Sequence, residues 1–127
     1  MAESVTHPFA RAIEARDEDA AVAILAEDVE FRSPAAHRPY RGKEQVEQLL
    51  RLVAIVFEDF RYTAEWRDGL TTILLFEARV GDRELQGVDI LEDGEDGLIE
   101  CFTVMIRPLS GLQAVARTMA ERLGISA

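Results

Sequence analysis

Apolar residues in the segment 43–57 recur at steps of three and four, and charged residues fall between them. This spacing predicts an amphipathic helix that opens after Gly42. Two shorter helices are expected before it. The first runs over about 8–16 and can be capped by Thr6, while Asp17 is a plausible N-cap for the second.

After Phe57 the period of the pattern changes from 3.6 residues to 2. Four alternating segments follow, near 59–67, 71–80, 83–92 and 98–107. Their connections are rich in glycine and aspartate, which tolerate the positive φ angles of tight hairpin turns. The four segments therefore predict an antiparallel meander. One more short strand is expected over 29–33, followed by a loop with two prolines.

Helices that precede a run of strands are typical of the α+β class. We expect a cone-shaped, curved antiparallel sheet, formed by the four-strand meander and the short N-terminal strand. The sheet should wrap around the three N-terminal helices, with an extra C-terminal helix over 109–123. The 127 residues suit one domain, 1–127, with its core in 8–107.

Both faces of the predicted sheet are apolar, and the three early helices can cover only one of them. The other face needs either the C-terminal helix or a second copy of the chain, because so large an apolar patch is unusual in a monomer. We therefore expect a homodimer that packs through the sheet faces.

The balance of acidic and basic residues limits the classes of binding partner that we expect. Fourteen Lys and Arg residues face 24 Asp and Glu residues, a formal net charge of −10. Nucleic acids and anionic membranes need clustered positive charge, so neither is an expected partner. The single cysteine, Cys101, excludes an intrachain disulfide, and no apolar run suggests a signal peptide or a membrane span. We expect a cytoplasmic protein.

No metal or cofactor is expected. His7 and His37 lie far apart and lack acidic partners at the spacing of metal ligands. The sequence contains no P-loop, no G-x-G-x-x-G and no nucleophile elbow.

The acidic residue that stands out is Asp89, in the apolar strand segment LQGVDILE. Burial would raise the pKa of this carboxyl group and make it useful near neutral pH, as a hydrogen-bond donor or as an acid/base. The alternative is a structural aspartate that is hydrogen-bonded to a Tyr, a Thr or a backbone N–H. Both interpretations remain open from the sequence.

The order of these elements resembles the nuclear transport factor 2-like superfamily, and more narrowly its SnoaL-like branch. The matching pieces are FARAIEARDEDAAVAILAEDVEFRSP, PYRGKEQVEQLL and GVDILEDGEDGLIECFTVM. The resemblance implies a mostly apolar pocket inside the cone. Members include ketosteroid isomerases, polyketide cyclases, limonene epoxide hydrolases and non-catalytic proteins, so the fold does not fix the function.

The catalytic patterns of that superfamily are only partly present. In the isomerases a general-base aspartate lies where this chain has Ser33, an oxyanion-binding tyrosine lies where it has Phe9, and a protonated carboxylic acid matches Asp89. The cyclases place an acid at Thr103. The epoxide hydrolases use the positions of Gly87, Asp89 and Thr103. Asp89 is the only acidic residue that survives in these schemes.

The resemblance, together with strand alternation, places Asp89 as the candidate catalytic residue at the pocket wall. The expected pocket-lining residues are Phe9, Ile13, Phe31, Ser33, His37, Tyr40, Val53, Phe57, Thr103 and Met105. Tyr62 and Trp66 are expected to share one face of the first meander strand, because their spacing is even.

Two functions remain open. In the first, the chain binds a small apolar molecule and acts on it through Asp89 as an isomerase-, cyclase- or hydrolase-type acid–base enzyme. In the second, it is a non-catalytic, dimeric ligand carrier or interaction module of the same fold. The sequence does not decide between an enzyme and a binding protein.

Overall fold

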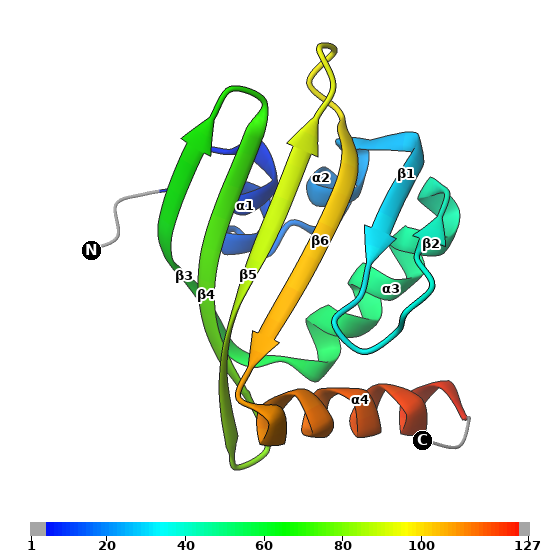
Figure 1. Cartoon of the computed structure of the whole chain (residues 1–127), viewed down its shortest axis with the longest axis vertical. Helices are drawn as coiled ribbons and strands as arrows, with labels where there is room; N and C mark the ends of the chain where they lie inside the picture. Colours follow the sequence, from blue (N-terminus) through cyan, green and yellow to red (C-terminus); the bar gives the residue numbers. More distant parts are fainter. Residues whose placement is uncertain (1–4, 125–127) are drawn as a thin grey trace.

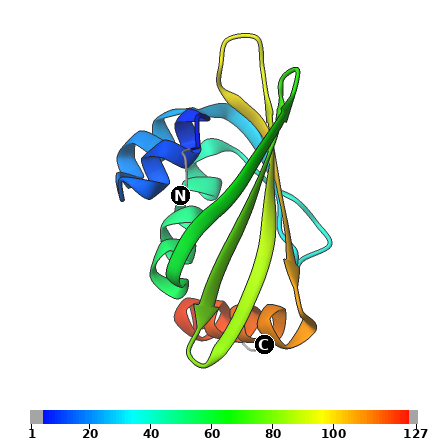
Figure 2. The ribbon, with the colours of Figure 1, turned by 90° about the vertical axis from the view of Figure 1, so that its left-hand side faces the viewer.

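The structure is a computed structural model that describes residues 5–124, in which a curved sheet carries helices on one side (Figure 1, Figure 2). The helices are α1 (Pro8–Glu14), α2 (Glu18–Ala23), α3 (Lys43–Val56) and α4 (Leu109–Leu123). The strands are β1 (Leu25–Arg32), β2 (Tyr40–Arg41), β3 (Glu58–Asp68), β4 (Thr71–Val80), β5 (Arg83–Asp93) and β6 (Ile99–Arg107).

Strands β3 to β6 form the predicted antiparallel meander. At its first two turns Gly69 and Gly81 hold φ angles of +61° and +62°, a conformation that residues with a side chain rarely adopt. Strand β1 runs parallel to β6, and β2 pairs antiparallel with β1, so the sheet order is β2-β1-β6-β5-β4-β3. The predicted α+β class and the curved sheet are confirmed, but the prediction of an antiparallel sheet is wrong for the N-terminal strand, because β1 runs parallel to β6.

The sheet has one strand more than predicted, and β1 starts earlier. Helix α2 ends at Ala23, and the Ile24 carbonyl already accepts a hydrogen bond from the Ile99 N–H of β6 at 2.8 Å. This contact draws the chain into the sheet at Leu25 rather than at residue 29. Strand β2 lies inside the segment that was expected to be a loop, where two residues pair with β1.

The helix boundaries follow local caps. Asp17 caps α2 as predicted, since its side chain accepts a hydrogen bond from the Ala20 N–H at 3.1 Å. Helix α3 begins after Gly42, whose φ of +97° turns the chain out of β2. Helix α4 has the predicted bounds and ends at Gly124, which adopts the left-handed conformation.

The prediction that Thr6 caps α1 is wrong, because His7 takes that position. The Nδ1 atom of His7 accepts a hydrogen bond from the Phe9 N–H at 3.0 Å, while Thr6 donates to the Glu65 carboxylate through its N–H at 2.7 Å. His7 is 1% exposed, and its Nε2 lies 2.9 Å from Asp93 Oδ2. Because Nδ1 accepts, Nε2 carries the proton, and this N–H donates a hydrogen bond to Asp93.

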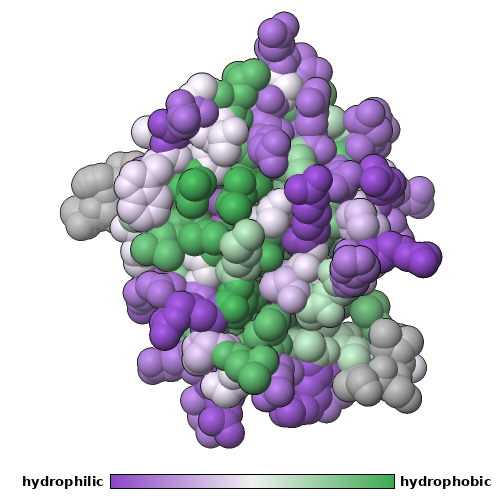
Figure 3. All heavy atoms as spheres, viewed as in Figure 1, coloured by the Kyte–Doolittle hydropathy of each residue, from purple (hydrophilic) through white to green (hydrophobic). Residues whose placement is uncertain are grey.

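All four helices lie on the concave side of the sheet (Figure 2). Helix α4 crosses the lower end of the cone and turns Val115 and Met119 inward, so it does not cover the outer face. That face carries a broad apolar area with hydrophilic margins (Figure 3). Trp66 and Met105 on it are 55% and 56% exposed. Within residues 5–124, none of the helices is both long and apolar enough to pass through a bilayer.

Candidate functional site

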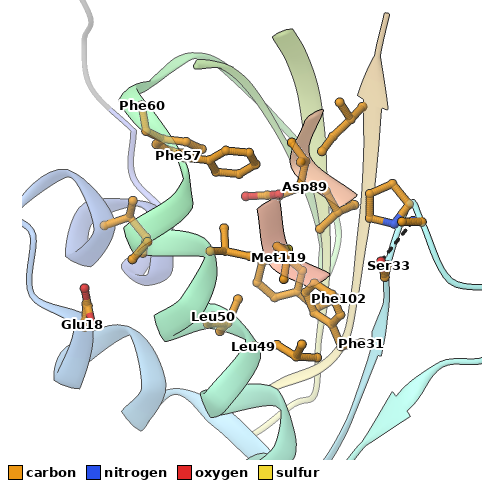
Figure 4. Close-up of a pocket in the computed structure, with 18 of the residues that line it drawn as sticks. Glu18, Phe31, Ser33, Leu49, Leu50, Phe57, Phe60, Asp89, Phe102 and Met119 are labelled. Atoms are coloured by element: carbon orange, nitrogen blue, oxygen red, sulfur yellow. Dashed lines mark hydrogen bonds between the residues drawn. The ribbon is translucent and has the colours of Figure 1, made fainter. Parts of the chain in front are cut away.

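A cavity of about 640 Å³ lies between the concave face of the sheet, helices α1 and α3, and helix α4 (Figure 4). Its wall is mostly apolar. The aromatic residues that line it are Phe9, Phe31, Tyr40, Phe57, Phe60, Tyr62 and Phe102. The aliphatic lining residues include Ile13, Leu49, Leu50, Val53, Val104, Ile106, Val115, Met119 and Leu123. This composition suits a small molecule with a large apolar surface.

Asp89 lies in the wall of this cavity, in the middle of β5. It is paired in register with Leu74 of β4 and Val104 of β6, so the same sheet face carries two apolar neighbours. The residue is 6% exposed. The Tyr62 hydroxyl donates a hydrogen bond to Asp89 Oδ2 at 2.8 Å. A buried carboxyl group therefore has one protein donor and otherwise apolar surroundings.

The second carboxyl oxygen of Asp89 is free to meet a ligand. Among residues 5–124, Oδ1 of Asp89 has no hydrogen-bond partner. In the same residues, every side-chain nitrogen or oxygen that solvent cannot reach does have such a partner. Oδ1 therefore remains open to the cavity. Figure 4 shows the carboxyl group pointing into the hollow beside Phe57.

Burial changes the proton affinity of both groups in this pair. Desolvation raises the pKa of Asp89 from 3.8 to about 7, and the hydrogen bond from Tyr62 opposes this rise. Burial and the neighbouring Asp89 carboxyl group raise the pKa of Tyr62 well above 10. Near neutral pH, Asp89 can therefore gain or lose a proton, while Tyr62 remains a hydrogen-bond donor.

An aromatic cluster holds Tyr62 in place. The Phe60 ring meets the Tyr62 ring edge-on at 5.0 Å and stacks on the Phe76 ring at 4.9 Å. Phe76 in turn lies over Gly87, which is its register partner on β5. A Cβ atom on Gly87 would come within 2.5 Å of the Phe76 ring. The missing side chain at Gly87 therefore makes room for the cluster that positions Tyr62.

Seven of the ten residues predicted to line the pocket do lie in the cavity wall. They are Phe9, Ile13, Phe31, Ser33, Tyr40, Val53 and Phe57. They come from α1, β1, β2, α3 and the segments that follow β1 and α3, so the fold brings together side chains that are distant in sequence. Whether they contact a ligand remains a prediction.

Three predicted lining residues lie elsewhere. His37 is exposed in the connection between β1 and β2 and is outside the cavity. Thr103 and Met105 pair with Ile90 and Val88, so they lie on the outer face. The prediction that they share a face with Asp89 is wrong, because Asp89 pairs with Val104, and directly opposite residues in antiparallel strands lie on the same face. Phe102, Val104 and Ile106 take the inner positions.

The partner of Asp89 was missed because of an irregularity in β3. Even spacing predicts that Tyr62 and Trp66 share a face, but the register between β3 and β4 shifts between Tyr62 and Ala64. Tyr62 is therefore buried at 4% exposure, and Trp66 lies on the outer face. Such a bulge leaves no signal in an alternating pattern.

Two other titratable side chains lie outside the cavity. Cys101 is half-buried on the outer face. His7 does have an acidic partner, Asp93, but 86 positions separate the two residues in sequence, so spacing cannot reveal the pair. Within residues 5–124, no three His, Cys, Asp or Glu side chains gather in a way that could hold a metal ion.

Comparison with known proteins agrees with this architecture. Residues 6–120 match the model of the SnoaL-like domain. The chain is 45% identical to a steroid delta-isomerase from Pseudomonas aeruginosa, covering 90% of this chain and 85% of that one with a TM-score of 0.86. It is 32% identical to an uncharacterised protein with a cystatin-like fold from Silicibacter pomeroyi, covering 94% and 87% with a TM-score of 0.87. The chain has no match among curated proteins.

A putative ketosteroid isomerase from Kribbella flavida shares the fold at 22% identity, with 80% of this chain and 73% of that one covered and a TM-score of 0.66. The SnoaL-like model spans nearly the whole described chain, from α1 into α4. The chain belongs to the SnoaL-like domain family, within the nuclear transport factor 2-like superfamily.

Proposed function

We propose that the protein binds a small, mostly apolar molecule in the cavity and that Asp89 contacts the polar end of this molecule. The observation that carries the proposal is the Asp89 carboxyl group, 6% exposed in an apolar wall, with one oxygen bound by Tyr62 and the other open to the cavity. A cavity of about 640 Å³ is within the range of small-molecule sites.

Proton transfer at Asp89 is the chemistry that this site supports best. A carboxyl group with a pKa of about 7 is present in both protonation states near neutral pH, which suits a general acid or base. The 45% identity to a protein named a steroid delta-isomerase favours isomerisation as the reaction class to test. Because Ser33 stands where the isomerases have their base, Asp89 would both remove and return the proton.

Filling the cavity tests the binding step. Ala116 lies on α4 in the cavity wall, so Ala116→Trp is expected to abolish binding of apolar molecules in a thermal-shift screen of terpenoid and steroid compounds. Arg117→Trp is the matched control, because residue 117 is exposed on the same helix. Equal ligand-induced shifts in both variants and the unmodified protein would place binding outside the cavity.

The reaction is tested separately. A β,γ-unsaturated ketosteroid is incubated with the protein, and the absorbance of the conjugated enone is followed. Conversion that Asp89→Asn abolishes would support the acid–base function. Binding without conversion would favour a ligand carrier instead.

A dimeric module is the second candidate, and the uncovered outer face favours it. Trp66 and Met105 are each more than half exposed there, beside the partly exposed Leu75 and Ile90. We propose that a second copy of the chain covers this face. The face has charges of both signs at its margin, whereas the whole chain carries a net charge of −10. Two copies related by a twofold axis can therefore pair opposite charges around an apolar centre.

Sedimentation velocity tests the dimer. Met105→Glu is expected to give a monomer. Leu109→Glu, which places the same charge at a residue 67% exposed on α4, should leave the dimer intact. A monomeric unmodified protein at micromolar concentration would rule out this proposal.

A further inference from the structure

The cavity contains a carboxyl group without a counter-cation. Of the residues that line it, only Arg16 and Arg61 are basic, and both are exposed at the rim. Arg61 already pairs with Glu77 at 2.6 Å. Asp89 has a single polar partner among residues 5–124, the uncharged Tyr62 hydroxyl. A negative charge on Asp89 would therefore lack a positive partner until a ligand supplies one.

The wall beside Asp89 is aromatic. Phe57 lies next to the carboxyl group in Figure 4, and its ring stacks against that of Phe60 at 5.7 Å. The faces of such rings carry partial negative charge and attract cations, most strongly where water is excluded. Together, a carboxyl group and aromatic faces form the recognition chemistry of a protonated amine.

The rim of the cavity is negatively charged, as is the ionised form of Asp89. Four acidic residues and two arginines lie there, a net charge of −2; the acids are Glu14, Asp17, Glu18 and Asp59. Glu18 pairs with Arg51 and Asp59 with Arg79, whereas Glu14 and Asp17 form no ion pair among residues 5–124. Glu14 is near enough to Tyr62 that its charge contributes to the raised pKa of that phenol. In a chain with a net charge of −10, this rim attracts cations and repels anions.

From this geometry we infer that the cavity is selective for a lipophilic amine, whose protonated nitrogen binds Asp89 Oδ1 and whose apolar frame fills the cavity. The inference rests on the proposed binding function, but it requires no reaction. A carboxylate ligand would meet the acidic rim and an uncompensated Asp89. A neutral alcohol or ketone could accept or donate one hydrogen bond, but it would gain nothing from the rim or from the ring faces.

Three compounds with one tricyclic frame separate these classes. They are dehydroabietylamine, the corresponding alcohol dehydroabietinol, and dehydroabietic acid. Isothermal titration calorimetry of the whole chain at pH 8, where Asp89 is already ionised, is expected to give an affinity for the amine at least about tenfold higher than for the alcohol, since a hydrogen bond to a charged group exceeds a neutral one. The acid is expected to bind most weakly.

Proton release provides a second readout. The amine should bind the ionised form of Asp89, whereas the free protein at pH 6 holds a proton there. With a pKa of about 7, amine binding should release about 0.9 proton at pH 6 and about 0.1 at pH 8. The release is measured from the binding enthalpy in two buffers with different ionisation enthalpies. The alcohol should release none.

Two variants locate the effect. Asp89→Asn should lower the affinity for the amine by about tenfold to a hundredfold and abolish proton release. The affinity for the alcohol should change by less than about threefold. Asp82→Asn removes the same charge from a side chain that is 95% exposed in a hairpin turn, and it should change neither. Binding of the alcohol as tight as that of the amine, or amine binding unaffected by Asp89→Asn, would overturn this inference alone. If none of the three compounds binds, both proposals fail.

Discussion

The Asp89 carboxyl group is expected to make the free energy of unfolding depend on pH, and replacing Asp89 by asparagine should remove this dependence. The folded carboxyl group has a pKa of about 7, whereas its value in the unfolded chain is near 3.8. Between these two pH values the folded protein holds a proton that the unfolded chain has lost. The free energy of unfolding therefore falls as the pH rises through this window, and it levels off once both states are ionised.

The size of this effect follows from the difference between the two pKa values. A difference of 3.2 units, from 3.8 to about 7, corresponds to about 4 kcal/mol in total. About 2.5 kcal/mol of this falls between pH 5 and pH 8. Asparagine cannot titrate, and its carbonyl oxygen can still accept the hydrogen bond from Tyr62. The free energy of unfolding of Asp89→Asn minus that of the unmodified protein should therefore rise by about 2.5 kcal/mol from pH 5 to pH 8.

Urea unfolding followed by circular dichroism at pH 5, 6, 7 and 8 measures this difference. Subtracting the free energy of unfolding of the unmodified protein from that of the variant removes the contributions of the other carboxylates, which are the same in both proteins. Asp82→Asn, in which an exposed carboxylate is lost, should give a difference that does not vary with pH. A flat difference for Asp89→Asn, or one that decreases with pH, would show that the folded carboxyl group does not have a raised pKa.

Three further predictions concern the surroundings of this group. Tyr62→Phe should raise the pKa of Asp89 by about one unit, because the lost hydrogen bond stabilises the ionised form; carboxyl ¹³C NMR measures this shift, and an unchanged or lowered pKa would contradict it. Gly87→Ala should cost about 1–3 kcal/mol in urea unfolding, because its Cβ would overlap the Phe76 ring, and an unchanged midpoint would contradict the close approach. His7→Ala should cost about 1–2 kcal/mol through the lost cap of α1, and His7→Asn should restore part of it, since asparagine is also a good N-cap.

The fold could be predicted because its signals are local. Helix α3 has a clear apolar stripe, and the hairpin turns carry glycines at positions with positive φ, so the order of elements follows from short windows of sequence. Strand β2 could not be predicted, because it forms only through its pairing with β1. The start of β1 depends likewise on a hydrogen bond to β6, which is more than 70 positions away in the sequence.

The candidate site was only partly predictable, because side-chain direction depends on register. Asp89 could be found from its apolar neighbours, but its partner Tyr62 could not, since the shift in β3 changes which residues face the cavity. Alternation correctly divides β6 into two faces, yet it does not say which face is the inner one. The pairing of Asp89 with Val104 settles that question and moves Thr103 to the outer face.

The residues at the other two isomerase positions limit the reactions in which Asp89 can take part. At the position of the general base, Ser33 accepts a hydrogen bond from the Ala35 N–H at 3.1 Å and so serves the turn after β1. At the position of the oxyanion-binding tyrosine, Phe9 packs edge-on against Phe102 at 5.0 Å. Neither can exchange a proton with a ligand as an aspartate or a tyrosine would. Of the three isomerase positions, only Asp89 therefore carries a group that can exchange a proton with a ligand near neutral pH. The negative charge that Asp89 gains when it loses its proton has no positive partner among residues 5–124 until a ligand supplies one.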